Sequence, residues 1–571
     1  MSEHDLVIRG GTIVDGSGGA LFEGDVAVKD GRIAALGQVG GRGAEEIDAK
    51  GRIVTPGFVD VHTHYDGQAI WSERLAPSSS HGVTTAVMGN CGVGFAPCRA
   101  DDRNLLVRVM EGVEDIPGVV MTEGLRWDWE TFPEYLDRLE AGRRDIDVAA
   151  YLPHSPLRVY VMGERGARRE PATAGDLARM RALSRQAIEA GALGFATSRL
   201  NIHRTADGDQ IPSYDADTAE LKAICAGMSD AGSGVLQIVL DAYRGWTDEF
   251  DVMADVVKAC GRPATYTLAC GNDGPPTWRE AIARMEAANA AGASITAQVM
   301  PRPIGLIAGI ELSVHPFVLC PSYRAIAHLP LAERIAAMRN PELRRAILSD
   351  TPEPGHPLSG IARIWQWMFP LNDPPNYAPP ADQSIAALAA ARGCTPAEYA
   401  YDAFLDSEGD AMFLAALGNY ENGRLDAARE MLTHPHCVPG LGDGGAHYGA
   451  VCDASYSTFL LTHWVRDAKE RRIDVAQAIH MLTARTARTV GLGDRGMLRA
   501  GAKADINVID LDRLQLHRPE IVHDLPARGR RLDQRASGYD ATIVSGAVIR
   551  RHGEATGALP GTLVRGARGS A

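Results

Sequence analysis

Short apolar runs alternate with longer amphipathic stretches through the middle of the chain. Such runs are typical of buried strands, and the stretches between them have the 3.6-residue period of helices, as in PATAGDLARMRALSRQAIEAG. Eight β-α units predict an α/β fold, a closed (β/α)8 barrel of the TIM type. The predicted strands are residues 57–61, 83–88, 147–153, 193–197, 234–240, 264–269, 294–299 and 437–442.

Both ends of the chain have a different pattern. Val- and Ile-rich segments are separated by Gly-containing turns, as in DLVIRGGTIVDG near the N-terminus and YDATIVSGAVIRRHG near the C-terminus. This pattern predicts hairpins. We therefore expect residues 1–56 and 490–571 to pair in one small β-sandwich domain beside a barrel at residues 57–489.

The connection between the seventh and eighth strands is much longer than the others. Residues 301–436 are rich in proline and contain helix-like stretches, for example at 331–349 and 397–405. Because a barrel typically needs about 250 residues, we predict an inserted subdomain after strand seven. Loops that follow barrel strands lie over the active-site face, so this subdomain is expected to form a lid or wall.

Composition narrows the range of partners and compartments. The formal net charge is −14, which argues against a nucleic-acid partner and gives no sign of membrane attachment. The N-terminus shows no secretory pattern, and the nine scattered cysteines form no CxxC pair. These features predict a soluble, cytoplasmic protein of several domains. They leave the oligomeric state open, a homo-oligomer included.

Two histidines follow directly after the first predicted strand, in the segment GFVDVHTHYDG at residues 57–67. Side chains alternate along a strand, so His62 and His64 are expected to point the same way, into the mouth of the barrel. Two imidazoles on one face could hold a metal ion. The alternative is a pair of hydrogen-bonded structural histidines, because short motifs often match by chance.

The segments around these histidines resemble a known family. TPGFVDVHTH, the N-terminal β segment and the C-terminal RGMLRAGAKADINVID together resemble the amidohydrolase superfamily of metal-dependent hydrolases. Within it, GVTTAVMGNCGVGFAP at residues 82–97 is similar to the N-acyl-D-amino-acid deacylases, or D-aminoacylases. The resemblance covers nearly the whole chain and implies a barrel with a flanking β domain built from both chain ends.

The resemblance also implies roles for two further residues. The deacylases place a metal-ligating cysteine in a Gly-Asn-Cys-Gly turn, which corresponds to Cys91, although a buried free thiol is the alternative. Asp443 in CVPGLGDGGAHYG stands where the superfamily keeps its catalytic aspartate, although Asp next to Gly is also a common turn signal. The implied reaction is hydrolysis of a linear amide (N-acyl) bond by metal-activated water, with Asp443 as general base and acid.

Departures from the family pattern change the expected metal content. Strands five and six lack the two histidines that the deacylases use as ligands, and hold Gln237 and Thr267 or a neighbour instead. Strand four has no lysine that could bridge two metals. We therefore expect one Zn²⁺ ion rather than two, with Mn²⁺, Co²⁺ or Fe²⁺ as alternatives. Its expected ligands come from the set His62, His64, Cys91 and Asp443.

The substrate is also expected to differ from that of the family. Members that recognise D-amino acids hold the carboxylate with the arginine of a His-Pro-Arg segment, but this chain has Cys452, Asp453 and Ala454 there. Asp453 would repel an anion, so we expect a neutral or larger amide rather than a simple N-acyl-D-amino acid. Loop residues near the strand ends are further candidates for substrate contact: His154, Arg199, His203, Gln237, Arg302, His447 and Tyr448.

Two other functions stay open at this point. The same scaffold could cleave a cyclic amide, an ester or a C–C bond, and the missing histidines make this credible. A catalytically inactive homologue that only binds its ligand is the other alternative. The joint presence of both histidines, Cys91 and Asp443 argues against that second alternative.

Overall fold

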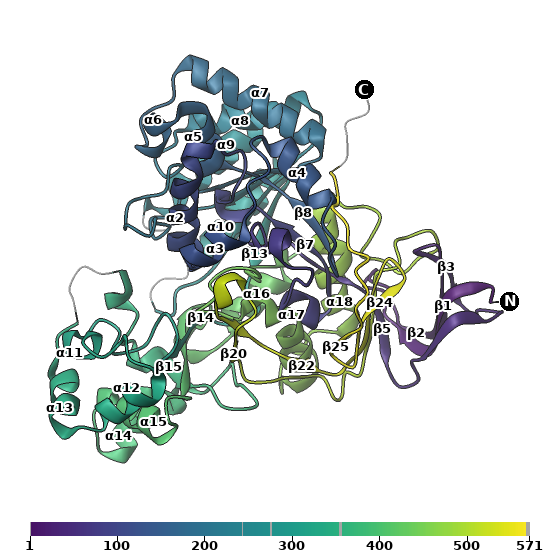
Figure 1. The fold of residues 1–571 in the computed structure, drawn as a ribbon. Helices are drawn as coiled ribbons and strands as arrows, with labels where there is room; N and C mark the ends of the chain where they lie inside the picture. The colour runs from purple at the N-terminus through teal and green to yellow at the C-terminus, as the bar shows by residue number, and fades with distance from the viewer. Residues whose placement is uncertain (1, 242–243, 274–276, 353–356, 567–571) are drawn as a thin grey trace.

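Parallel strands from the middle of the chain form two sheets in a computed structural model that describes residues 2–241, 244–273, 277–352 and 357–566 (Figure 1). One sheet has the order β6 (Phe58–Asp60), β7 (Val83–Met88) and β8 (Asp147–Ala150). The other has the order β9 (Leu152–Pro153), β10 (Gly194–Ser198), β11 (Val235–Val239), β12 (Ala264–Thr267), β13 (Ile295–Val299) and β17 (Cys437–Pro439). The eight predicted strands are confirmed, the third being interrupted between β8 and β9.

Backbone hydrogen bonds connect these two sheets at both edges. The N–H of Tyr151, which lies between β8 and β9, donates to the carbonyl of Met88 in β7 over 2.9 Å. At the opposite edge, the Asp443 N–H donates to the His62 carbonyl over 3.0 Å and the His64 N–H donates to the Gly444 carbonyl over 2.8 Å. The segment that follows the last strand is therefore bonded to the segment that follows the first.

Helices occupy the connections between consecutive strands. The predicted helix before β10 is confirmed as α7: it begins after Thr173, which forms a capping box with Asp176, and ends at Gly191 in a left-handed conformation. The connecting helices are α2 (Arg103–Glu114), α3 (Gly118–Gly124), α4 (Phe132–Glu140), α5 (His154–Met162), α7 (Ala174–Ala190), α8 (Thr218–Asp230), α9 (Trp246–Cys260), α10 (Thr277–Ala290) and α16 (Asp426–Thr433). After β17 come α17 (Tyr456–Phe459), α18 (Val475–His480) and α19 (Thr486–Thr489).

The alternation of side chains along the strands separates two environments. One set packs against the helices, as where the Tyr266 ring of β12 meets Trp246 and Phe250 of α9 edge-on. The other set includes buried polar side chains, among them Gln237 of β11 and Gln298 of β13. Polar atoms buried on strands need specific partners, so these glutamines mark a functional or structural site.

Strands from both ends of the chain lie in one sheet. Its order is β25-β24-β23-β18-β5-β1-β2-β3, with β4 paired to β1. β18 pairs antiparallel with β5, so that Ile509 lies opposite Ile53. The strands are β1 (His4–Ile13), β2 (Phe22–Lys29), β3 (Arg32–Gly37), β4 (Gly43–Asp48), β5 (Ile53–Pro56), β18 (Ile506–Ile509), β23 (Tyr539–Val544), β24 (Ala547–Arg551) and β25 (Glu554–Ala555).

The long connection after β13 has a sheet and an apolar cluster of its own. β14 (Ile304–Gly309), β16 (Met412–Gly418) and β15 (Met368–Pro370) form an antiparallel sheet, and helices α11 to α15 group on the far side of the molecule from β1–β3 (Figure 1). The predicted helical stretch at 331–349 is two helices, α12 (Leu331–Met338) and α13 (Pro341–Ser349). They separate because Asn340 caps α13 and Pro341 occupies its first turn. The remaining helices are α11 (Pro321–Arg324), α14 (Ile385–Arg392) and α15 (Pro396–Asp406).

Two further observations concern disulfide bonds and membrane-spanning helices. All nine cysteines are free thiols. Among the described residues, none of the helices has both the length and the apolar character that a bilayer crossing requires.

A buried ion cluster ties the segment after α19 to the strands. The Arg495 guanidinium lies 2.6 Å from the Asp147 carboxylate of β8 and donates to the Thr85 hydroxyl of β7 over 2.8 Å. The Lys503 ammonium lies 3.0 Å from the same carboxylate. Removal of one partner from a buried ion pair leaves the other charge uncompensated, which is far costlier than the loss of an exposed pair.

We therefore expect Arg495→Ala to lower the free energy of unfolding by about 3–5 kcal/mol. The matched control is Arg499→Ala, which removes an exposed arginine from the same segment and should change it by less than about 0.5 kcal/mol. Urea titration followed by circular dichroism measures both. Equal effects of the two substitutions would contradict the structural role of the cluster.

Candidate metal centre

Three side chains with metal-binding atoms meet at the ends of the first two strands. His62 and His64 follow β6, Cys91 lies in the turn after β7, and their ligand atoms all lie within 4.8 Å of one another. The Cys91 sulfur is 3.4 Å from His62 Nε2 and 3.9 Å from His64 Nε2. All three side chains are buried.

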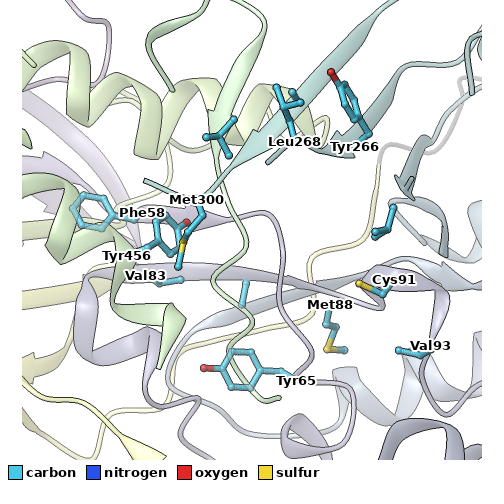
Figure 2. Close-up of a cluster of buried hydrophobic side chains, with 14 of the residues drawn as sticks. Phe58, Tyr65, Val83, Met88, Cys91, Val93, Tyr266, Leu268, Met300 and Tyr456 are labelled. Atoms are coloured by element: carbon cyan, nitrogen blue, oxygen red, sulfur yellow. The ribbon is translucent and has the colours of Figure 1, made fainter. Parts of the chain in front are cut away.

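The backbone around Cys91 explains why its turn needs glycine. Cys91 itself has a left-handed conformation, with φ of 57°, and Gly92 follows at φ of 68°. A Cβ atom on Gly92 would lie 2.7 Å from Thr197 Cα of β10, so that only glycine allows the turn to pack there. The Cys91 N–H donates to Gln237 Oε1 over 3.0 Å. Figure 2 shows the sulfur in a buried cluster with Met88 and Val93.

Asp443 joins this cluster from the segment after β17. Its Oδ1 lies 3.4 Å from His62 Nε2 and 3.6 Å from His64 Nε2. Burial raises the pKa of Asp443, but the imidazoles of His64 and His62 outweigh it and lower the pKa well below its usual range. The carboxylate therefore faces the two imidazoles in its ionised form.

These four side chains fit a divalent metal ion. Burial raises the pKa of the Cys91 thiol well above its usual value, and the charges of Glu114 and Asp443 add to this effect. A thiolate in such surroundings is unfavourable unless a cation lies beside it. Two imidazole nitrogens, a sulfur and a carboxylate oxygen are donors that tetrahedral zinc accepts. They could hold the ion through His62 Nε2, His64 Nε2, Cys91 Sγ and Asp443 Oδ1.

Two residues that the sequence analysis missed lie behind the imidazoles. Gln298 Oε1 is 2.6 Å from His62 Nδ1, and Glu114 Oε1 is 3.3 Å from His64 Nδ1. A partner at Nδ1 directs the lone pair of Nε2 toward a metal. Gln298 could have been found as a polar residue within an apolar strand. Glu114, at the end of α2, has no local signal.

Asp66 is a third missed residue, and it extends the alternation of His62 and His64 by one step. Its Oδ2 accepts a hydrogen bond from the Gly89 N–H over 3.1 Å. Burial raises the pKa of Asp66 to about 7, and burial also raises the pKa of Glu114 well above its usual value. Several buried carboxyl groups therefore surround the ligand cluster.

The structure brings three of the other candidate residues to the cluster. Gln237 holds the Cys91 backbone, and His447 Nε2 lies 3.5 Å from the second oxygen of Glu114. Burial lowers the pKa of His203 to about 3, with further lowering by the charges of His447 and His64. His203 therefore lies beside the cluster, on the segment that follows β10.

The polar atoms of three other candidates are bonded elsewhere. Both His154 nitrogens are engaged, with the Thr197 hydroxyl at 2.8 Å and the Glu220 carboxylate at 2.9 Å. Arg199 forms a buried two-pronged pair with Glu249, at 2.7 and 3.0 Å. The buried Tyr448 hydroxyl donates to Gln68 Oε1 over 3.0 Å. The structure does not bring these polar groups to the ligand cluster.

Arg302, the last candidate, forms a buried ion pair with Asp453. Its Nη2 lies 2.8 Å from Asp453 Oδ1. Asp453 is thus a carboxylate paired with a cation, whereas the sequence analysis considered its negative charge alone. The sequence could not indicate this pair because the two residues lie far apart along the chain.

Comparisons with known proteins identify similar sequences over most of the chain. A profile of the Amidohydrolase family matches residues 45–550. An N-acyl-D-glutamate deacylase of Alcaligenes xylosoxydans xylosoxydans is 28% identical over 524 residues, which are 89% of this chain and 88% of that protein. A D-aminoacylase of the same organism is 25% identical over 584 residues, which are 98% of this chain and 97% of that protein.

Solved structures show the same fold. A D-aminoacylase studied for its binuclear metal centre is 22% identical, with a TM-score of 0.65 over 98% of this chain and 100% of that one. An N-acyl-D-glutamate deacylase of Bordetella bronchiseptica, solved with zinc and a phosphonate mimic of the tetrahedral intermediate, is 23% identical. Its TM-score is 0.64 over 98% of this chain and 99% of that one.

The ligand cluster predicts metal binding that depends on its histidines. Protein purified without chelator should contain about one zinc per chain by ICP-MS, and His62→Ala/His64→Ala should lose it. The matched control is His434→Ala/His436→Ala, since these residues form a second His-x-His segment on the surface. Metal retained in the first double variant, or lost equally in both, would contradict the site.

The position of Glu114 predicts a smaller effect on affinity. Glu114→Gln should weaken zinc binding about 10–100-fold, because a bound cation would favour the ionised form of the Glu114 carboxyl, 3.3 Å from His64 Nδ1, and the amide cannot carry that charge. Competition with a chromogenic chelator measures the affinity. The exposed residue Glu123 provides the control Glu123→Gln, for which no change is expected. Unchanged affinity in both variants would remove Glu114 from the site.

Proposed function

Because the chain belongs to the amidohydrolase family, we propose that it is a metal-dependent hydrolase that cleaves a linear N-acyl amide bond of a small molecule. Family membership makes it a hydrolase of carbon–nitrogen bonds other than peptide bonds. One observation supports the proposal of a metal-dependent amide hydrolase. Two imidazoles, a thiol and a carboxylate lie together although they come from the first two and the last of the eight strand units.

We propose that one Zn²⁺ ion is held by ligands from the set His62, His64, Cys91 and Asp443, with Mn²⁺, Co²⁺ or Fe²⁺ as alternatives. A catalytic site keeps one position open for water, so one of the four would lie beside the ion without binding it. When bound, the ion supplies Lewis acidity, which polarises an amide carbonyl and lowers the pKa of water. A count of one is supported by β11 and β12, which offer Gln237 and Thr267 in place of further histidines.

Asp443 is the proposed proton carrier. Its ionised carboxylate would accept a proton from the attacking water and deliver it to the leaving nitrogen. Gln237 Nε2 is a buried donor with no hydrogen-bond partner among the described residues, which supports a role in binding the substrate oxygen. His203 and His447 would line the same space.

The proposed architecture is a (β/α)8 barrel at residues 57–489 with a second domain beside it and an inserted subdomain. Residues 1–56 and 490–571 would form the β-sandwich domain, and 301–436 the inserted subdomain. The strand order and the hydrogen bonds between its two ends support the barrel. The nine free thiols favour a reducing compartment, so cytoplasmic location stays our prediction.

Substitution of the proton carrier tests the mechanism. Asp443→Asn should lower kcat for linear N-acyl amines about 10²–10⁴-fold, because the amide cannot carry the proton. Chromatography of the released amine measures the rate, and ICP-MS reports whether the metal is retained. The control is Asp426→Asn on the surface helix α16, which should keep full activity.

A panel that also contains lactams and esters separates the alternatives. Activity confined to lactams or esters would mean that the protein cleaves one of these bonds and not a linear amide. Full activity of Asp443→Asn would refute the proposed role of the carboxylate.

A further inference from the structure

The pair of Arg302 and Asp453 joins the segment after β13 to the segment after β17. Arg302 follows β13 and Asp453 follows the loop that carries Asp443. The guanidinium donates through Nη2 to Asp453 Oδ1 and to the Cys452 carbonyl, both at 2.8 Å, and through Nη1 to the Ser455 hydroxyl at 2.8 Å. Its Cζ lies 3.9 Å from the centre of the Tyr377 ring, which the inserted segment contributes.

Within this pair, the carboxylate is the accessible partner. The Asp453 side chain is 11% exposed, whereas that of Arg302 is 1% exposed and lies behind it. The two Nη atoms of Arg302 are bonded to Asp453, the Cys452 carbonyl and Ser455, so Arg302 holds Asp453 in place. The Arg302 Nε is buried and has no hydrogen-bond partner among the described residues.

Asp453 also lies within electrostatic reach of the proposed catalytic groups. Burial raises the pKa of Asp453 to about 6 although Arg302 lowers it, and Asp443 raises it further while His447 lowers it. Burial lowers the pKa of His447, and the charges of Asp443 and Asp453 act against this effect. The contact of 2.8 Å between Asp453 and the Arg302 guanidinium favours the ionised carboxylate.

The other arginine among our candidate residues is neutralised as well. Arg199 is bonded to both oxygens of Glu249 and to the Ala216 carbonyl, and it is buried. Each of these two arginines is therefore paired with a carboxylate of the same chain, and neither offers an uncompensated positive charge to an anionic group on the substrate.

We propose that Asp453, held by Arg302, selects substrates whose leaving group carries a hydrogen-bond donor and no carboxylate: N-acyl derivatives of amino-acid amides or of diamines. This inference rests on the proposed hydrolase function and names its substrate class. A carboxamide or ammonium group can donate to Asp453, whereas a carboxylate in the same place is repelled. The selection works by repulsion as much as by attraction.

Matched substrate pairs test this inference on the zinc-loaded protein at pH 8. Each pair consists of an N-acetyl amino acid and the corresponding N-acetyl amino-acid amide, for several side chains and both enantiomers. The members differ only in carboxylate against carboxamide. The wild-type protein should prefer the amide at least about tenfold in kcat/KM, which corresponds to about 1.4 kcal/mol.

Asp453→Asn should reduce this preference at least about tenfold, mainly by improving the rate for the acids, because the repulsive charge is gone. The side-chain oxygen of asparagine can still accept from Arg302, which favours folding. The matched control is Asp402→Asn. Asp402 also pairs with an arginine, Arg344, that stacks on a tyrosine, Tyr401, but lies in the inserted segment. It should leave the preference unchanged.

Binding of the products makes the test independent of turnover. Calorimetry with each amino-acid amide and its parent amino acid should show the same preference in the wild type and its loss in Asp453→Asn. This binding pattern without any hydrolysis would refute the proposed function and keep the inference.

Three outcomes would overturn the inference itself. They are equal use of acids and amides by the wild type, an unchanged ratio in Asp453→Asn, and no binding of either product class.

Discussion

Many ionisable groups are buried together in one small region. The rest of this structure depends on how their charges are compensated. Burial raises the pKa values of the Cys91 thiol and of the Asp66 and Glu114 carboxyl groups. Only Asp443 escapes this effect, because two imidazoles face it. Buried anions are stable only beside a compensating cation. The metal ion proposed above would supply such a cation. Behind the two imidazoles, Gln298 Oε1 lies 2.6 Å from His62 Nδ1, and Glu114 Oε1 lies 3.3 Å from His64 Nδ1.

Chain closure brings the parts of this site together. His62 and Asp443 belong to the first and last of the eight strand units, and a backbone hydrogen bond joins them directly. The segment between β13 and β17 and the C-terminal segment meet at Tyr377, whose hydroxyl donates to Gln534 Oε1 and whose ring lies against the Arg302 guanidinium. Segments far apart along the chain thus meet both at the ligand cluster and at the Arg302–Asp453 pair.

Charge pairing engages the two arginines that follow β10 and β13. Each is paired with a carboxylate of the same chain, Glu249 for Arg199 and Asp453 for Arg302. Removal of one partner from such a buried pair would leave the other charge uncompensated. Relatives named as N-acyl-D-glutamate deacylase and D-aminoacylase are similar over most of this chain, but the choice of substrate is set by the residues of a site and not by the fold.

The sequence by itself determined the strand and helix order and the side chains that meet in the candidate metal centre. Periodicity is a local property, so the eight strands, helix α7 and the shared face of His62 and His64 followed from it. Tertiary structure alone decided which polar side chains face the site. His154 and Arg199 stand at strand ends as substrate residues would, but their partners Glu220 and Glu249 come from later helices. Glu114 and the Arg302–Asp453 pair act through contacts between distant segments, and only the folded chain brings such segments together.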